Sequence, residues 1–191
     1  MADRPLHAVI LAGGAARRMS GTDKLMLQVG GRTLLEHVVA SVRAAAEIVV
    51  VGPQRPAVPD VRWTSEEPAG GGPVAGLAAG LAALPRPAGA HVAVLAADLP
   101  GLRADTIERL RAALDANEHA DGAVLVDESG RRQWLTGVWH GSALLAAVPG
   151  DPAGRSVRAT LGPLRVVDVA ARAGEAADVD TPDDLIRLRR R

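Results

Sequence analysis

A glycine-rich stretch with nearby cations is the part of this sequence best suited to chemistry. It spans residues 11–24 and reads Leu-Ala-Gly-Gly-Ala-Ala-Arg-Arg-Met-Ser-Gly-Thr-Asp-Lys. Adjacent glycines let a ligand approach the backbone because no Cβ stands in the way, and successive N–H groups can then converge on an anion. Arg17, Arg18 and Lys24 add positive charge, balanced locally only by Asp23. This pattern favours a polyphosphate ligand, with an ordinary loop of solvated arginines as the alternative.

The two commonest phosphate-binding motifs do not describe this stretch. No Gly-Lys-Ser/Thr closes it, which excludes a Walker A motif. Its glycines at 13, 14 and 21 do not fit the G-x-G-x-x-G spacing of dinucleotide-binding proteins, which argues against a dehydrogenase. Residues 7–11 form an apolar run with the length of a buried strand, and no helical or strand period continues beyond them. We therefore expect residues 11–24 to form a loop.

A second candidate residue, Asp98, follows the most convincing strand of the sequence. Residues 91–96 form an unbroken apolar run, and Ala-Asp-Leu-Pro comes directly after it at 97–100. Open α/β sheets hold their ligands just beyond the carboxyl ends of their strands. Asp98 is therefore the first choice for a metal-binding residue, with a turn or helix-capping role as the alternative.

The rest of the sequence alternates short apolar runs with stretches of helical spacing. Thr33 and Glu36 have the spacing of a capping box for a first helix. Pro73 opens a second helix, in which Gly76 and Gly80 permit close approach to a sheet or to a ligand. We predict strands at 7–11, 48–51, 61–64, 91–96, 121–126, 133–140 and 164–169, and helices at 34–42, 73–84, 105–116, 142–148 and 156–161. This order predicts an α/β fold with a mostly parallel sheet.

Composition excludes several classes of function. The chain has 191 residues with 22 basic and 22 acidic side chains, so no net field draws it to nucleic acid or to a membrane. Without cysteine it has no thiolate nucleophile or cysteine-bound metal, and without Phe or Tyr it has few stacking platforms for single strands. The length is typical of one domain, residues 1–191. The sequence shows no signal peptide or membrane-spanning apolar run, and we expect a cytoplasmic protein.

The glycine-rich stretch and its continuation resemble the signature of the MobA-like nucleotidyltransferases, L-A-G-G-x-x-x-R-M-G-x-x-D-K followed by G-x-x-L-L. Residues 11–24 and 31–35 carry this pattern, with Ser20 where glycine is usual. Three further family motifs have counterparts in this chain: G-P-L-A-G at 72–76, A-x-D-x-P at 96–100 and N-V-N-T-P-E-E-L at 178–185. The resemblance covers residues 7–188 and is greatest to the branch that guanylylates the molybdenum cofactor.

The resemblance implies a single-domain, three-layer αβα Rossmann-like nucleotidyltransferase fold. The implied reaction moves GMP from GTP to the phosphate of molybdenum-loaded molybdopterin and releases pyrophosphate. Gly13 favours GTP, because guanine-using members carry L-A-G-G and cytosine-using members L-A-A-G. The alternatives are a CTP:molybdopterin cytidylyltransferase, a guanylyltransferase for another small phosphorylated acceptor, and a non-catalytic nucleotide-binding module. We expect no nucleic-acid or membrane partner, and a monomer or a weak homo-oligomer.

The resemblance also implies roles for individual residues. The catalytic residues would be Arg18, Lys24 and Asp98. The nucleotide would be bound by Lys24 and Asp98 together with Leu11, Ala12, Gly13, Gly14, Glu67, Gly72, Pro73 and Gly76, with Glu66 as the alternative to Glu67. A Mg²⁺ ion would be held by Asp98 and by Asp180, which stands with Asp178 where the family has asparagines. Four arginines near the expected acceptor site have no settled role: Arg131, Arg132, Arg155 and Arg158. We expect Lys24 and Asp98 to share one cleft.

Overall fold

The computed structural model describes residues 4–13, 18–19, 22–55, 58 and 60–179. Its main sheet has seven strands: β1 Leu6–Leu11, β6 Glu47–Val51, β7 Arg62–Thr64, β8 His91–Ala96, β9 Gly122–Val126, β10 Arg132–His140 and β11 Val166–Ala170. Their order across the sheet is β11-β9-β10-β8-β1-β6-β7. β10 runs antiparallel to both of its neighbours, and every other pair in this sheet is parallel. The predicted α/β class with a mostly parallel sheet is confirmed.

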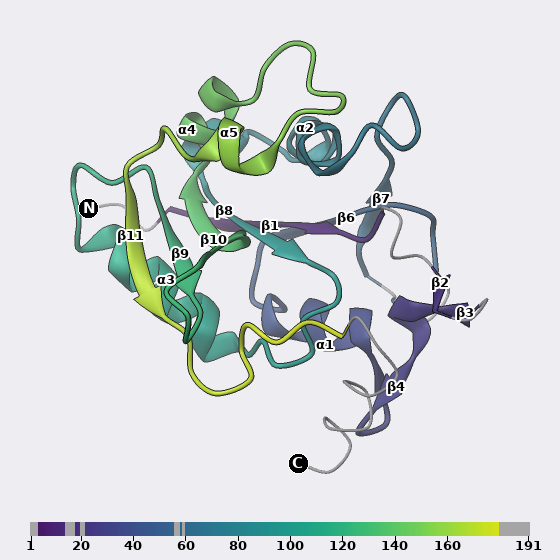
Figure 1. Cartoon of the computed structure of the whole chain (residues 1–191). Helices are drawn as coiled ribbons and strands as arrows, with labels where there is room; N and C mark the ends of the chain where they lie inside the picture. The colour runs from purple at the N-terminus through teal and green to yellow at the C-terminus, as the bar shows by residue number, and fades with distance from the viewer. Residues whose placement is uncertain (1–3, 14–17, 20–21, 56–57, 59, 180–191) are drawn as a thin grey trace.

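Two layers of helices enclose the sheet (Figure 1). One layer holds α1 Leu34–Ser41 and α3 Ala104–Asp115, and the other holds α2 Pro73–Ala83, α4 Gly141–Ala147 and α5 Val157–Leu161. Each layer packs its apolar side chains on one face of the strands. The three-layer αβα arrangement expected from the resemblance is therefore confirmed.

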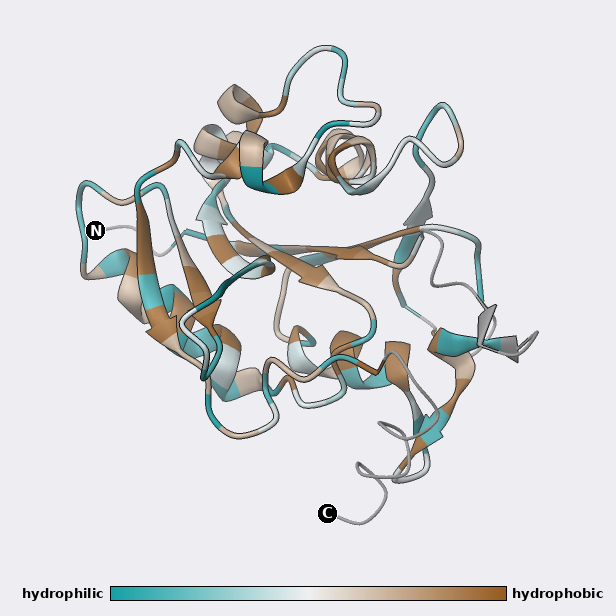
Figure 2. Ribbon diagram, viewed as in Figure 1, coloured by the Kyte–Doolittle hydropathy of each residue, from teal (hydrophilic) through white to brown (hydrophobic). Residues whose placement is uncertain are grey.

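The central strands form because their side chains are apolar on both faces. In β1, Ala8 and Ile10 pack in the cluster that contains α1 and α3, whereas Val9 packs in the cluster that contains α2. In β8, Ala93 and Val94 divide in the same way. Strands that are buried on both faces read as continuous apolar runs, which is the pattern of parallel sheets covered by helices. These runs are the brown ribbons at the centre of Figure 2.

The first helix begins where the sequence predicts. The Thr33 hydroxyl accepts a hydrogen bond from the Glu36 amide at 3.2 Å, and the Glu36 carboxylate accepts one from the Thr33 amide at 2.6 Å. This capping box satisfies two amides that the first turn would otherwise leave without partners. It also fixes the point at which the segment after the glycine-rich stretch enters α1.

The segment before α1 contains short elements that the sequence does not predict. Residues 18–24 are not one continuous loop, because β2 Arg18–Met19 pairs with β3 Thr22–Asp23, and a 3₁₀ turn, η2 Lys24–Met26, follows. A second small pair joins β4 Gln28–Val29 to β5 Arg32–Thr33. Pairs of two residues are too short to show a hydrophobic period.

Two further segments complete the comparison with the sequence. A 3₁₀ turn, η3, covers Pro87–Gly89 between α2 and β8. The sequence also predicts a last helix that is capped by Thr181 and begins at Pro182, which lies outside the described residues.

A buried histidine and a half-buried one contact each other near the amino end of β8. His91 is 1% exposed and lies opposite His140 of β10, with ring centroids 5.1 Å apart. Burial lowers the pKa of His91, and the nearby Asp115 carboxylate only partly offsets this. Burial, followed by the charge of Arg4, also lowers the pKa of His140. The folded state therefore disfavours protonation of both rings.

We expect the free energy of unfolding to fall as the pH drops below about 6.5, the ordinary pKa of histidine. Below this pH the unfolded chain binds protons that the folded chain does not bind. This lowers the free energy of unfolding by at most about 1.4 kcal/mol per pH unit for each such histidine. Urea unfolding between pH 5 and pH 8 measures this slope, which His91→Gln should make shallower. Equal slopes in the parent and the variant would contradict the prediction.

Candidate functional site

The carboxyl edge of the sheet brings the two candidate loops together. β1 and β8 are parallel neighbours in which Leu11 lies opposite Ala96. One step further along the ladder, the Ala97 amide donates to the Leu11 carbonyl at 3.1 Å. The segment that follows Leu11 and the segment that carries Asp98 must therefore leave the sheet side by side. Such edges are where α/β proteins bind ligands.

Lys24 and Asp98 meet at this edge. Lys24 is the first residue of η2, and its Nζ lies 2.9 Å from Asp98 Oδ2. The lysine side chain is 3% exposed, whereas the aspartate side chain is 23% exposed. The Asp23 carboxylate caps η2 by accepting from the Leu25 amide at 3.2 Å. The structure thus joins an ammonium and a partly exposed carboxylate that are 74 positions apart in the sequence.

Asp98 has the chemistry of a ligand for a hard divalent cation. Mg²⁺ is usually held by one or two carboxylates plus substrate phosphates rather than by a cage of protein ligands. Within the described ranges no cluster of three or more His, Cys, Asp or Glu side chains could hold a metal. A single partly exposed carboxylate therefore fits a metal site that the substrate completes. Asp180, the second expected ligand, lies outside the described residues.

The start of the glycine-rich stretch is pressed against the segment that follows β6. The Ala12 amide donates to the Val51 carbonyl at 2.8 Å. A Cβ on Gly52 would lie 2.8 Å from the Ala12 carbonyl oxygen, and Gly52 has a φ of +143°. Only glycine fits this close approach of two backbones. Gly13 is exposed just beyond it, and Gly14 lies outside the described residues.

Other residues expected at the site show what holds α2 against the sheet. Gly72 caps α2 with a φ of 89°, and Pro73 is its first residue. Gly76 faces inward, where a Cβ would lie 3.3 Å from Leu11 Cδ2, and a Cβ on Gly80 would overlap Val9. These helix glycines therefore let α2 pack closely on β1.

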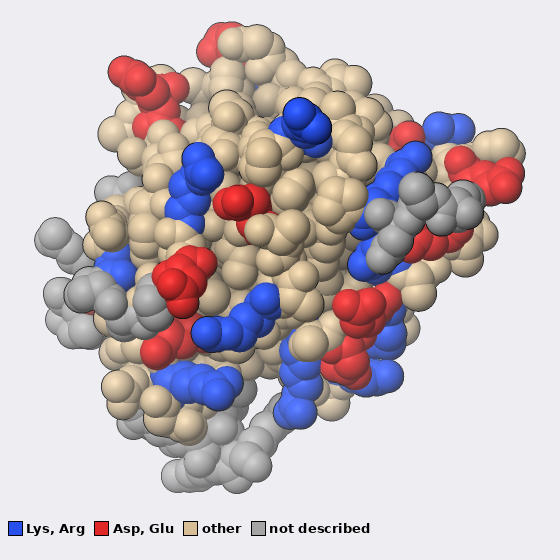
Figure 3. Space-filling view, turned by 180° about the vertical axis from the view of Figure 1, so that it is seen from behind, with Lys and Arg blue, Asp and Glu red and all other residues tan. Residues whose placement is uncertain are grey.

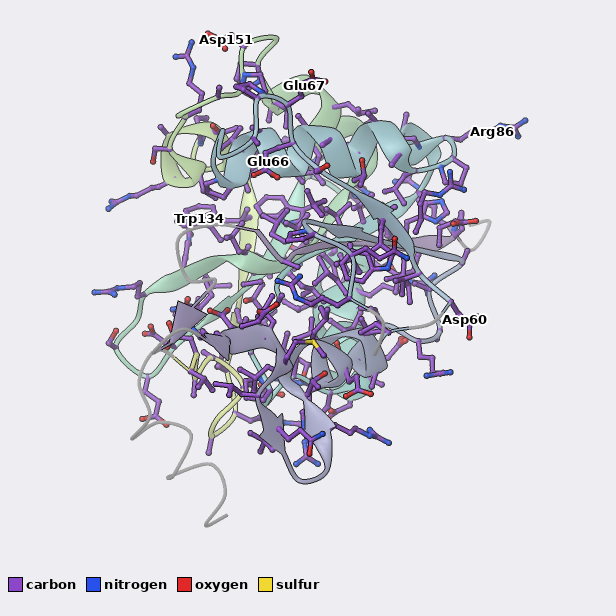
Figure 4. The ribbon with its side chains drawn as sticks, turned by 90° about the vertical axis from the view of Figure 1, so that its right-hand side faces the viewer. Asp60, Glu66, Glu67, Arg86, Trp134 and Asp151 are labelled. Carbon is purple, nitrogen blue, oxygen red and sulfur yellow. The ribbon has the colours of Figure 1, made fainter. Side chains whose placement is uncertain are left out.

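The two glutamates after β7 differ in their surroundings. Glu66 is 8% exposed and accepts a hydrogen bond from the Gly70 amide at 3.2 Å. Glu67, the residue selected from the sequence, is exposed. Figure 4 shows Glu66 nearer the sheet than Glu67. Neighbouring positions with the same side chain give no sequence signal for which of them points inward.

The arginines near the expected acceptor side engage local partners. Arg132 Nε lies 2.7 Å from Asp168 Oδ1, and its guanidinium lies 5.7 Å from the centre of the Trp134 ring. Arg155 donates to the Asp151 carbonyl at 3.1 Å. Arg131 and Arg158 are exposed on the surface, and the side chain of Arg18 is outside what the structure describes. Basic and acidic groups are interspersed over the face in Figure 3, in keeping with the zero net charge.

The segment after β11 is anchored beside the loop that carries Asp98. Its Glu175 carboxylate, which is buried, accepts from Thr106 Oγ1 at 2.7 Å and from Arg109. Burial alone would raise the pKa of Glu175, but hydrogen bonds from Arg109, the Arg172 amide and Thr106 outweigh it, so the pKa lies below its usual value. Further along, Val179 is buried against Leu34. The segment that carries Asp178 is therefore anchored on both sides, at Glu175 and at Val179.

Sequence reasoning missed Arg55. Its side chain is 5% exposed and contacts Asp23, 32 positions earlier, through Nε at 2.7 Å. The Pro-rich segment around it indicates only a surface link. Arginine is seldom buried unless it is paired, and here the partner lies in another element. No local pattern could have identified that contact.

The chain matches the family model described as the MobA-like NTP transferase domain over residues 8–166. A molybdenum cofactor guanylyltransferase of Bradyrhizobium sp. (strain ORS 278) is 39% identical over 138 residues, which cover 69% of this chain and 64% of that protein. One of Acidiphilium cryptum (strain JF-5) is 32% identical over 195 residues, covering 96% and 89%. The match to the Bradyrhizobium protein thus spans less than two thirds of that relative's length.

The fold also matches a solved structure. Molybdopterin-guanine dinucleotide biosynthesis protein A from Archaeoglobus fulgidus superposes with a TM-score of 0.71 at 21% identity, covering 96% of this chain and 97% of that one.

No helix among the described residues is long and apolar enough to cross a membrane.

We expect Asp98→Asn to lower the free energy of unfolding more than Lys24→Met. Asp98→Asn removes the carboxylate beside an almost fully buried ammonium, which costs about 1–3 kcal/mol. Lys24→Met leaves a carboxylate that still reaches water, so its cost should stay below about 1 kcal/mol. Urea unfolding at pH 7 compares the two variants with the parent. A larger loss of stability in Lys24→Met than in Asp98→Asn would mean that burial of the Lys24 ammonium does not depend on Asp98.

Proposed function

Because this chain belongs to the MobA-like NTP transferase family, we propose that it transfers GMP from GTP to the phosphate of molybdenum-loaded molybdopterin and releases pyrophosphate. The relatives named as molybdenum cofactor guanylyltransferases support this substrate pair. The observation that carries the proposal is the 2.9 Å contact between Lys24 and Asp98 at the edge where β1 and β8 end. It supports the proposal because it brings together the lysine and the carboxylate to which we assign phosphate binding and metal binding.

The reaction asks little of the protein beyond alignment and neutralisation of charge. The acceptor phosphate is itself the nucleophile, so no protein nucleophile is needed, in keeping with a chain that has no cysteine. Lys24, Arg18 and the backbone of residues 12–14 would hold the triphosphate. An ammonium has three donors, so Lys24 can keep Asp98 as a partner while it also donates to phosphate oxygens. Preorganised donors of this kind stabilise the charge that develops on the leaving pyrophosphate.

Asp98 would hold a Mg²⁺ ion, with Asp180 as the proposed second ligand. When bound, the ion would neutralise charge on the phosphate oxygens. Asp98 would then hold the ion beside Lys24, and both would supply positive charge to the bound phosphates. Water-exposed carboxylate surface on Asp98 leaves room for this coordination.

The guanine base would lie against the loop that precedes α2. Gly13 and the Gly72–Gly76 segment support guanine through the family resemblance. Guanine presents neighbouring N–H donors along one edge, which suit a carboxylate acceptor. We assign that acceptor to Glu67 or, because it faces inward, to Glu66. Cytosine presents only one amino donor at the corresponding edge.

We expect GTP, and neither CTP nor ATP, to release pyrophosphate when Mg²⁺ and molybdenum-loaded molybdopterin are present. The measurement is pyrophosphate release with each triphosphate, with and without the acceptor. Turnover with CTP would identify a cytidylyltransferase instead. Turnover of GTP with a small phosphorylated acid alone would identify another acceptor. Nucleotide binding without pyrophosphate release in any mixture would indicate a non-catalytic module.

Lys24→Met and Lys24→Arg should each lower the rate of pyrophosphate release by about a hundredfold to a thousandfold, the usual cost of removing one preorganised contact. The Lys24 side chain is 3% exposed, and a planar guanidinium does not reproduce the compact ammonium that pairs with Asp98. Arg43→Lys, at an exposed position without an assigned role, is the matched control and should keep the parent rate. Full activity in Lys24→Arg would mean that only positive charge matters there.

A further inference from the structure

Arg55 is a buried cation that none of the assigned roles uses. Its Nε donates to Asp23 Oδ2 at 2.7 Å, and its Nη2 donates to Asp23 Oδ1 at 3.3 Å. Its Nη1 donates to the Pro53 carbonyl at 3.0 Å and reaches the Ala12 carbonyl at 3.5 Å. A single guanidinium therefore contacts both ends of the glycine-rich stretch, Ala12 at its start and Asp23 near its close.

The contacts of Arg55 also bear on the position of Lys24. The Asp23 carboxylate that pairs with Arg55 also accepts a hydrogen bond from the Leu25 amide, and so caps the 3₁₀ turn that begins with Lys24. The turn aims the Lys24 ammonium at Asp98. Arg55 thus fixes the carboxylate, the carboxylate fixes the turn, and the turn fixes the direction of the lysine.

Gly52 strengthens the same arrangement from the neighbouring position. Its Cα lies so close to Ala12 that a Cβ would be 2.8 Å from the Ala12 carbonyl oxygen. The segment from Gly52 to Arg55 therefore packs on Ala12, at the start of the glycine-rich stretch, while the Arg55 side chain contacts Asp23 near its close. A planar guanidinium can bind a carboxylate with two parallel hydrogen bonds, which a lysine ammonium cannot do.

We propose that Arg55 is a positioning residue that holds together Ala12 and Asp23, at the start and near the close of the glycine-rich stretch, and so sets Lys24 in place for the triphosphate. This role rests on the proposed function, since the glycine-rich stretch is the proposed triphosphate site. In this role Arg55 acts through Asp23 rather than on the nucleotide, and its contribution is to keep Lys24 in place before the nucleotide binds.

The first test measures kcat and KM for GTP in Arg55→Met, Arg55→Lys, Asp23→Asn and the double variant Asp23→Asn with Arg55→Met. We expect each single variant to lose about tenfold to a hundredfold in kcat/KM, the scale of a small misplacement of a catalytic group. Because the two residues act as one unit, the loss of kcat/KM in the double variant should not exceed the larger of the losses in Asp23→Asn and Arg55→Met. Losses that multiply, or a parent value in Arg55→Met, would overturn the proposal.

Arg165→Met is the matched control. It removes another bidentate contact between a guanidinium and a carboxylate, in which Arg165 donates two hydrogen bonds of 3.2 Å to Asp121. This contact lies away from the glycine-rich stretch. It should keep the parent kcat/KM. All variants are compared at a temperature at which circular dichroism shows them folded.

A second measurement needs no nucleotide and so separates this proposal from the proposed function. In the nucleotide-free protein, hydrogen exchange at the Leu25 amide should be at least tenfold faster in Arg55→Met than in the parent, because its acceptor is no longer held. Unchanged exchange at the Leu25 amide would overturn the positioning role of Arg55. Faster exchange in a protein that never turns over GTP would support that role and reject the proposed function.

Discussion

The parallel pairing of β1 with β8 is the constraint on which the rest of this structure depends. β1 lies between β8 and β6, and all three strands point the same way. The segments that begin at Ala12, Gly52 and Ala97 therefore emerge together at one edge of the sheet. An antiparallel neighbour would have sent its following segment to the opposite edge. Every contact of the candidate site, including those of Arg55, follows from this shared direction.

Helix α2 packs closely on the strands that lead to that edge. With neither Phe nor Tyr in the chain, the core is filled mainly by Leu, Val, Ile and Ala. Small aliphatic side chains let helices lie near the strands, and Gly76 and Gly80 bring α2 nearer still. The exception is Trp139, which is fully buried where Gly122 and Gly137 leave space for its ring. The core behind the candidate site is thus close-packed around small residues.

The sequence predicts those parts of the fold that depend on local pattern. The apolar runs at 7–11 and 91–96, the capping box at Thr33 and the alternation of large and small residues at 133–140 each mark their element within a residue or two. The last strand is shifted from 164–169 to 166–170, because its alternation is weak where one face is exposed. The short pair of β2 and β3 has no period to detect, and depends on the chain around it.

The site is less visible in the sequence because it is made of contacts between distant segments. Asp98 and Lys24 could be selected by their motifs, since each follows a strongly marked strand or glycine pair. Arg55 and the inward direction of Glu66 could not, because burial of a charged side chain depends on a partner elsewhere in the chain. The residues that touch a ligand leave motifs, whereas the residues that hold them in place leave almost none.

Under the proposed function, the contact between Lys24 and Asp98 would explain how a neutral protein attracts a polyphosphate. With equal numbers of acidic and basic groups, the chain as a whole offers no steering field, so the attraction must be local. A buried charge needs a partner, because removal from water disfavours the charged form. Asp98 gives the buried Lys24 side chain a carboxylate partner at 2.9 Å, and its own partly exposed surface would let a metal ion join. An incoming triphosphate would then meet a cation that is already largely shielded from water, which would make each phosphate contact stronger than at an open surface.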